Sequence, residues 1–509
     1  MDFARMFYTY LPISLALYMI TRHLIHKLLN FPPTPFPVIP LIGHLYLLKK
    51  PLQKKLSNLS ELYGPVFFLR LGSRPVLVVS SVSAAEECFT KNDINFANRP
   101  QFLYAKYLGY NYNSIVWGPY GDHWRNLRRI ASIEILSSYR LQKLSQIRVD
   151  EVQTLMHKLF ISCTENKYRT LHLKPVLSEL MFNVMTRMIA GKRYFGENSS
   201  KSEEAKRFQE IIAESSVLVG ASNTGDFLPI VRWFVFNKME KKLKKLHMKR
   251  DELAQKWIDE FRDKISDDSA ESEDKSMIEI LLSLQQREPD YYTDETIKSL
   301  MLALLQAGVS TSVDTMEWAM AFLLNSPNVL KKAQTEIDNC VSQHRLIDEA
   351  DVSELPYLQC IIRETMRMCP VAPFLVPHES SMDSTVCGFH VPRRTMLLVN
   401  VKSIQNDPNY WEDPEVFRPE RFEGFDKANV GFKWMPFGLG RRGCPGEGLA
   451  MRIVGLALGS LIQCFDWDRM GKEMVDVTTG GGGLTAPMAQ PLVAKYRPRT
   501  TMLNLLCQI

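Results

Sequence analysis

A cysteine set among glycines near the C-terminal end is the residue best suited to chemistry. The stretch reads Phe437-Gly438-Leu439-Gly440-Arg441-Arg442-Gly443-Cys444-Pro445-Gly446. A thiolate that ligates iron must be shielded from water and must accept backbone N–H hydrogen bonds, since it would otherwise protonate or oxidise. The glycines let the backbone fold closely around a sulfur, and a helix that begins near Gly446 would direct its positive end toward the thiolate. The pattern predicts a buried thiolate ligand; the alternative is an ordinary glycine-rich loop with a buried cysteine.

The other cysteines carry no such pattern. The chain has nine, scattered from Cys88 to Cys507 with no C-x-x-C pair. This distribution is typical neither of a disulfide framework nor of a zinc site. We interpret the remaining eight as free thiols in a reducing compartment, and no metal site beyond Cys444 is indicated.

The stretch around Cys444 resembles the F-x-x-G-x-R-x-C-x-G pattern of cytochromes P450. All its fixed positions match: Phe437, Gly440, Arg442, Cys444 and Gly446. The resemblance implies haem b as the cofactor and Cys444 as the axial ligand of its iron, with Phe437, Gly438 and Gly446 beside the cofactor. Arg442 suits a haem propionate, because a guanidinium pairs with a carboxylate through two parallel hydrogen bonds.

Two further motifs imply a structural network. Glu364-Thr365-Met366-Arg367 is similar to the family's E-x-x-R, and an acid and a base three residues apart share a helical face. Pro419-Glu420-Arg421-Phe422 looks like the family's P-E-R-F. Together they imply that Glu364, Arg367 and Arg421 form a buried network that supports the haem pocket without taking part in catalysis.

Further side chains are expected at the haem propionates. Trp124 and Arg128 resemble the family's W-x-x-x-R, and their spacing puts an indole N–H and a guanidinium on one helical face. His378 lies where the family often places another basic contact. The resemblance adds these three residues to the cofactor-binding set.

The segment Ala307-Gly308-Val309-Ser310-Thr311-Ser312 resembles the family's A/G-G-x-D/E-T-T/S. The mid-helix Gly308 predicts the close approach of a bulky group. The resemblance assigns Thr311 as the catalytic hydroxyl that hydrogen-bonds dioxygen at the haem, while Ser310 stands where the family usually has an acid. A serine passes a hydrogen bond but is a poor proton reservoir near neutral pH. An alternative register through Asp314-Thr315 lacks the preceding glycine, so Thr311 is favoured.

The elements that must position these residues are mainly helical. Residues 293–325 form the longest predicted helix, which Thr293 can cap. Residues 66–71 and 76–80 flank a glycine-containing turn and predict a β-hairpin. The composition, 45% hydrophobic and 23% charged, is globular. The fold class is therefore mainly α with small β-sheets (α+β), and the resemblance implies the cytochrome P450 fold.

The N-terminus predicts a membrane anchor helix. An apolar run at residues 7–20 and its leucine-rich extension are long enough to span a bilayer once two basic side chains snorkel. More positive charge follows the run than precedes it, which favours a cytosolic body; a cleaved signal peptide is the alternative. We expect a single-pass protein of the endoplasmic reticulum membrane whose catalytic domain faces the cytosol. Its parts are residues 1–30 as anchor, 31–43 as a proline-rich hinge and 44–509 as the haem-thiolate catalytic domain.

The implied function is oxidation of a hydrophobic small molecule. The chain has no flavin or nicotinamide fingerprint, so electrons must come from NADPH through an external partner, NADPH-cytochrome P450 reductase. Pocket segments expected by family position are mainly apolar, with four tyrosines between residues 103 and 114, which favours an aromatic substrate. The chain resembles plant microsomal members of the isoflavone-hydroxylase-like group. This resemblance implies monooxygenation, by hydroxylation, of a phenolic specialised metabolite.

Other functions stay open. The same haem site could carry out oxidative ring closure, methylenedioxy-bridge formation or phenol coupling, which would depend less on an acid at position 310. An isomerase that needs no reductase is disfavoured by Thr311 and the anchor, and a non-catalytic haem sensor is the remote alternative. The net charge of +6 is mild and does not argue for a nucleic-acid partner.

Overall fold

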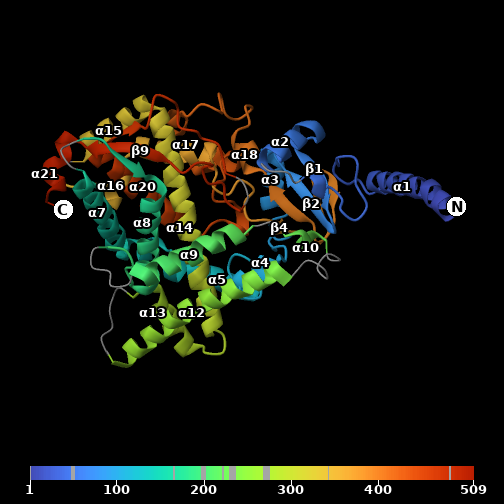
Figure 1. Ribbon diagram of the computed structural model, residues 1–509, viewed down its shortest axis with the longest axis horizontal. Helices are drawn as coiled ribbons and strands as arrows, with labels where there is room; N and C mark the ends of the chain where they lie inside the picture. Colours follow the sequence, from blue (N-terminus) through green and yellow to red (C-terminus); the bar gives the residue numbers. More distant parts are fainter. Residues whose placement is uncertain are drawn as a thin grey trace.

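The computed structural model describes residues 2–47, 52–163, 167–196, 202–220, 223–228, 237–267, 275–341, 343–480 and 483–508. Helices make up most of the body, the sheet that contains β1 (Val66–Leu71) and β2 (Arg74–Val79) lies on the side of the N-terminus, β9 (Val493–Pro498) lies on the opposite side near the C-terminus, and helix α1 projects away from the body (Figure 1). The prediction of a mainly helical chain with small β-sheets is confirmed.

The predicted hairpin is present. Strands β1 (Val66–Leu71) and β2 (Arg74–Val79) pair antiparallel, β7 (Met396–Val399) lies parallel to β2, and β4 (His378–Glu379) completes the sheet. Successive side chains of a strand point to opposite faces. Phe67 therefore packs into one apolar cluster and Val66 into another, so both faces of the sheet are covered.

Two smaller sheets complete the β-structure. One joins β3 (Arg169–His172), β9 (Val493–Pro498) and β8 (Phe465–Arg469), and the other pairs β5 (Ser384–Val386) with β6 (Phe389–Val391).

Helix α14 (Asp294–Asn325) crosses the body (Figure 1). The Thr293 side chain accepts the backbone N–H of Thr296, so the predicted cap is confirmed. The helix packs against α8 (Leu173–Ala190) and α20 (Glu447–Cys464). Both α14 and α20 are apolar and long enough to cross a membrane, but most of each apolar stretch is buried inside the body. We therefore interpret them as core helices.

The remaining described helices surround this centre. They are α2 (Leu52–Tyr63), α3 (Val82–Phe89), α4 (Leu103–Leu108), α5 (Asp122–Ile130), α6 (Ser138–Lys143), α7 (Ser145–Ser162), α9 (Ser202–Leu218), α10 (Thr224–Phe227), α12 (Asn237–Asp267), α13 (Met277–Arg287), α15 (Pro327–Cys340), α16 (Glu349–Ser353), α17 (Pro356–Met368), α18 (Val401–Gln405), α19 (Lys427–Val430) and α21 (Leu503–Leu506). The largest apolar cluster joins side chains of α7, α8, α14, α17 and α20.

Helix α1 (Asp2–Leu28) carries large apolar side chains that the body does not cover, among them Ile13, Leu17 and Ile20. The proline-rich segment that follows lies along β1, because the backbone N–H of Phe68 donates to the carbonyl of Pro33 at 2.8 Å. This arrangement suits the expected anchor and hinge. The division into residues 1–30, 31–43 and 44–509 stays a prediction.

Glu364, Arg367 and Arg421 form the predicted buried network. Arg367 Nε lies 2.7 Å and Arg421 Nε 2.9 Å from the Glu364 carboxylate. The backbone N–H of Arg418 donates to the same carboxylate at 3.0 Å. The side chains of Glu364 and Arg367 are fully buried, and the other donors of Arg367 reach backbone carbonyls. The network ties α17 to the segment that precedes residues 437–446, which we call the cysteine loop.

Candidate active site

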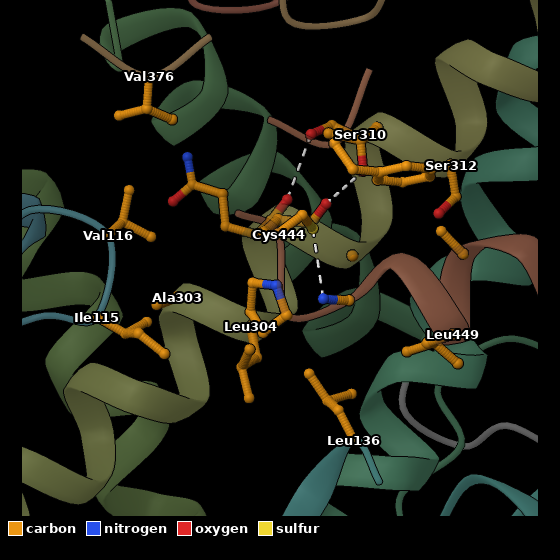
Figure 2. A pocket seen from close by; sticks show the side chains of 18 of the residues that line it. Ile115, Val116, Leu136, Ala303, Leu304, Ser310, Ser312, Val376, Cys444 and Leu449 are labelled. Carbon is orange, nitrogen blue, oxygen red and sulfur yellow. Dashed lines mark hydrogen bonds between the residues drawn. The ribbon is translucent and has the colours of Figure 1, made fainter. Parts of the chain in front are cut away.

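A mainly apolar cavity of about 370 Å³ contains the sequence-predicted site. Cys444 lines it from the cysteine loop, while Ser310, Ala303 and Leu304 line it from α14 (Figure 2). Thr311, Arg442, Trp124, Arg128, His378, Phe437, Gly438 and Gly446 line the same cavity. The fold thus brings together every residue that the sequence places at the site.

The sulfur of Cys444 lies at the start of a helix. As predicted, α20 begins at Glu447 with Gly446 as its N-cap. The backbone N–H of Gly446 donates to Cys444 Sγ at 3.3 Å (Figure 2). Burial raises the pKa of the Cys444 thiol, whereas this N–H and the charge of Arg128 lower it. The positive end of the helix and the N–H donor suit a thiolate ligand.

The glycines of the loop serve different purposes. Gly438 and Gly440 have φ values of 66° each, a conformation that side chains with a Cβ rarely adopt. A Cβ on Gly440 would also lie 2.3 Å from Asp93 Oδ1. Gly446 has an ordinary φ of −91°, and its added Cβ would stand 3.7 Å from Cys444 Sγ. The turn therefore requires glycine at 438 and 440, whereas a Cβ at position 446 would make only an ordinary van der Waals contact with the sulfur.

Arginines gather on the cavity wall without acidic partners. Within the described part of the chain, Arg99, Arg128 and Arg442 donate only to backbone carbonyls. Burial, followed by repulsion from Arg128, lowers the pKa of Arg442 to about 9. Burial, followed by repulsion from Arg442, lowers the pKa of Arg99 well below its usual range. Arg99 is buried, and Arg128 and Arg442 are half-buried. Cations that are held out of water without counter-charges are costly, so this wall fits a ligand that brings carboxylates.

Trp124 meets this wall through its ring. The indole N–H donates to the carbonyl of Ile115 at 2.8 Å. The donor that we expected to bind a propionate is therefore already paired with the backbone. The guanidinium of Arg442 lies 4.1 Å from the centroid of the Trp124 ring. Trp124 therefore orients Arg442 by stacking, a contact that W-x-x-x-R spacing alone does not indicate.

His378 is buried beside these arginines. Its Nδ1 lies 2.8 Å from the carbonyl oxygen of Phe96, and since a carbonyl only accepts, Nδ1 carries a proton. Burial, followed by the charge of Arg99, lowers the pKa of His378 well below its usual range. The imidazole is therefore neutral in this arrangement, unlike the basic contact implied by the family. A carboxylate in the cavity would be needed to raise its pKa, and the propionate role stays a prediction.

The hydroxyl residues Ser310 and Thr311 line the cavity, and Figure 2 shows Ser310 there. Thr311 Oγ1 donates to the carbonyl of Ala307 at 2.6 Å, and Ser310 Oγ donates to the carbonyl of Gln306 at 3.3 Å. Each hydroxyl oxygen can still accept a hydrogen bond, and each proton can be redirected by rotation about the C–O bond. The pair can therefore hold or pass a proton inside the cavity.

The absence of a side chain at Gly308 lets the neighbouring helix α8 pack closely against α14. A Cβ on Gly308 would lie 2.7 Å from the side chain of Met185 on α8. The close approach that a mid-helix glycine predicts is therefore made by a methionine of the protein.

Some lining residues could not be read from the sequence. The tyrosines between residues 103 and 114 do not line the cavity: Tyr104 packs edge-on against Trp117, and the Tyr110 hydroxyl donates to Asp251. The inference of an aromatic substrate from these tyrosines is therefore not supported. In their place α8 contributes Met181, Met185 and Met188, α9 contributes Ser216, the turn after α9 contributes Val219, and α12 contributes Arg250. The helical spacing of the methionines was a usable signal, whereas nothing marks Arg99 or Arg250.

Comparisons with known proteins agree with this geometry. A family model described as Cytochrome P450 matches residues 32–492. The chain is 49% identical over 507 residues to "Cytochrome P450 81Q32" of Catharanthus roseus, which covers 99% of this chain and 98% of that one. It is 48% identical to "Isoflavone 3'-hydroxylase" of Medicago truncatula, over 92% of each chain. It is 44% identical to "(+)-piperitol/(+)-sesamin synthase CYP81Q2" of Sesamum radiatum, over 99% of each chain.

Solved structures show the same fold. A zebra fish cytochrome P450 solved with progesterone superposes with a TM-score of 0.74 at 27% sequence identity, covering 88% of this chain and 100% of that one. The fold and the cysteine-lined cavity thus define the class of haem-thiolate monooxygenases. The chain belongs to the cytochrome P450 family, in its plant CYP81 branch, and is a monooxygenase enzyme.

The residues present fit the haem that this family implies. A sulfur at a helix start faces the cavity, and the arginines without acidic partners in the described part of the chain are opposite in charge to the two propionates of the cofactor. Cys444 would hold the iron, and Arg128 and Arg442 would hold the propionates.

Proposed function

We propose that this protein is a reductase-dependent monooxygenase that hydroxylates a hydrophobic, phenolic plant metabolite. One observation carries the proposal: Cys444 and the hydroxyl of Thr311 line one mainly apolar cavity. An apolar lining suits a hydrophobic substrate, and relatives include a protein named as an isoflavone 3'-hydroxylase.

The chain's own residues divide the work. Haem, when bound, supplies the activation of dioxygen and the electron transfer that protein side chains cannot perform. Cys444 anchors it, and Arg442 and Arg128 fix its orientation through the propionates. Thr311 and Ser310 hold and pass protons at their hydroxyl oxygens, while the apolar lining orients the substrate and excludes water.

The electrons and the location follow from the rest of the chain. The sequence contains no flavin or nicotinamide fingerprint, so NADPH-cytochrome P450 reductase is the proposed donor. The uncovered apolar side chains of α1 support anchoring in the endoplasmic reticulum membrane with the body in the cytosol.

A second candidate is oxidative ring closure, such as methylenedioxy-bridge formation, or phenol coupling. Ser310 favours it, because a serine replaces the usual acid of the proton relay. The 44% identity to a protein named as a piperitol and sesamin synthase also supports it.

Product mass under labelled dioxygen tests both candidates. Microsomes that contain the protein and a reductase would be incubated with a panel of plant phenolics and NADPH. Products heavier by one labelled oxygen would support hydroxylation, and products lighter by two hydrogens without label would support ring closure or coupling. Products that form without NADPH would contradict both.

A further inference from the structure

Helix α12 places one arginine in the cavity wall. Arg250 lines the cavity and is only 2% exposed. Among the residues that the structure describes, neither Nε nor Nη1 of its guanidinium has a hydrogen-bond partner. A buried guanidinium with unsatisfied donors is costly, so a native chain keeps one where a ligand completes it.

The neighbouring acid does not neutralise Arg250. Asp251 pairs with Lys298 at 2.7 Å and accepts the Tyr110 hydroxyl at 2.9 Å. The Tyr110 ring in turn packs edge-on against His247. Burial lowers the pKa of Arg250 to about 10, so the guanidinium is still charged at neutral pH. Its charge therefore lies at the wall of a mainly apolar cavity, and no carboxylate of the described residues pairs with it.

Arg250 is separate from the arginines assigned to the propionates. The pair Asp251–Lys298 and the contact cluster that contains Ala254 and Leu302 hold this part of α12 against the first turns of α14. Leu302 precedes Thr311 by nine residues, about 13 Å along a helix that rises 1.5 Å per residue. Arg250 therefore lies toward the end of the cavity that is remote from Ser310 and Thr311.

We infer that Arg250 is a specificity-determining residue that binds an acceptor oxygen, carbonyl or carboxylate, at the end of the substrate remote from the reacting carbon. A charged donor at one end of an apolar cavity fixes which end of an elongated aromatic molecule faces Cys444. The inference rests on the proposed function in one respect, that the bound ligand is the substrate. The binding itself can be measured without turnover.

Ligand-induced shifts of the haem absorption band test the inference on the full-length holoenzyme. Isoflavanone and isoflavan form one matched pair, since the second lacks only the ring carbonyl; ferulic acid and methyl ferulate form another, which separates charge from hydrogen bonding. The variants are Arg250→Met, which removes the charge at similar length, Arg250→Lys, and Lys245→Met as a control on an exposed position of the same helix.

The expected result is selective. Arg250→Met should weaken binding of the acceptor-bearing ligand by about 10- to 100-fold, the value of a hydrogen bond to a charged group, and leave isoflavan binding unchanged. Loss confined to isoflavanone identifies a carbonyl site, and loss for ferulic acid alone identifies a carboxylate site. Arg250→Lys should recover part of the affinity, and Lys245→Met should match the parent protein.

Two results would overturn the inference: a parent protein that does not distinguish ligands by their acceptor oxygen, and an Arg250→Met variant that retains the distinction. Thermal unfolding of Arg250→Met distinguishes a ligand-binding role of Arg250 from a structural role. Removal of an uncompensated buried charge should not lower the Tm, whereas loss of a structural contact should. A parent protein that binds selectively but forms no oxidised product would contradict the proposed function and leave Arg250 as a binding residue.

Discussion

The ammonium of Lys174 on α8 lies 2.9 Å from the carboxylate of Asp314 on α14. Lys174 also lies 3.2 Å from the carboxylate of Glu317, which is fully buried. The Asp314 side chain is only 5% exposed and does not belong to the cavity lining. Asp314 is therefore part of a structural ion pair between helices, which disfavours the alternative register, although Thr315, the hydroxyl residue of that register, lines the cavity. Ser310 and Ser312 are both polar neighbours of Thr311 in the cavity, and Ser310 holds the position where the family usually has an acid.

Replacement of Ser310 by alanine should uncouple the enzyme. The variant loses the hydroxyl that can pass a proton next to Thr311, and general acid–base groups contribute about 10²-fold or more. We expect a several-fold fall in product formed per NADPH consumed, with a matching rise in peroxide, measured in the same microsomes. Asp314→Asn is the control: it should leave this ratio unchanged while lowering the Tm, because it weakens the pair with Lys174. An unchanged ratio in Ser310→Ala would make the serine a neutral variation.

The sequence predicts those parts of the site that depend on local pattern. The thiolate loop, the cap at Thr293 and the pairing of Glu364 with Arg367 each follow from residues that lie close together in the chain. No local sequence pattern predicts Arg99 or Arg250 as lining residues. A single arginine forms no periodic pattern, and its burial depends on helices that are far apart in the sequence. The sequence placed Tyr110 in the pocket wrongly for the same reason, because its hydroxyl donates to Asp251 of the distant helix α12.

Removal of Arg367 should prevent stable folding, whereas removal of a neighbouring arginine should not. Arg367→Ala leaves the buried Glu364 without its main partner, which costs about 3–5 kcal/mol. Arg418→Ala keeps the backbone N–H that donates to Glu364 and loses only exposed ion pairs with Glu412 and Asp413, worth about 0–1 kcal/mol each. Denaturation midpoints and the yield of haem-bound protein would measure the difference. Equal loss in the two variants would argue against the buried network as the stabilising element.

Retention of haem should depend on Arg442 and not on the arginine beside it. Arg442 lines the cavity, whereas Arg441 pairs with Asp93 at 3.3 Å on a half-exposed side chain. We expect Arg442→Met to release haem to an apoprotein acceptor about 10- to 100-fold faster, which corresponds to a charge-assisted hydrogen bond. Arg441→Met should stay within about twofold of the parent protein by the same scale. Similar release rates in both variants would exclude Arg442 as a propionate contact.

Cys444 should be the one cysteine on which the absorption signature depends. Cys444→Ser removes the thiolate, so the ferrous carbon monoxide complex should lose the red-shifted band typical of thiolate ligation, together with activity. Cys387→Ser alters an exposed cysteine on the surface and should leave band and activity intact. A red-shifted band that persists in Cys444→Ser would assign the ligand to another residue.

Membrane attachment should be sensitive to a charge in α1 and not to the same charge on the body. Leu17 on α1 and Leu62 on α2 are 65% and 76% exposed, so neither substitution disturbs a packed core. An aspartate at the centre of a spanning helix costs about 2.5–3.5 kcal/mol, so Leu17→Asp should move a large share of the protein from the membrane pellet to the carbonate-soluble fraction. Leu62→Asp should leave the distribution unchanged. If both variants stay in the pellet, α1 is not the principal anchor, and the exposed lysines Lys241, Lys242, Lys244 and Lys245 of α12 become the next surface to test, because basic helix faces bind anionic lipid.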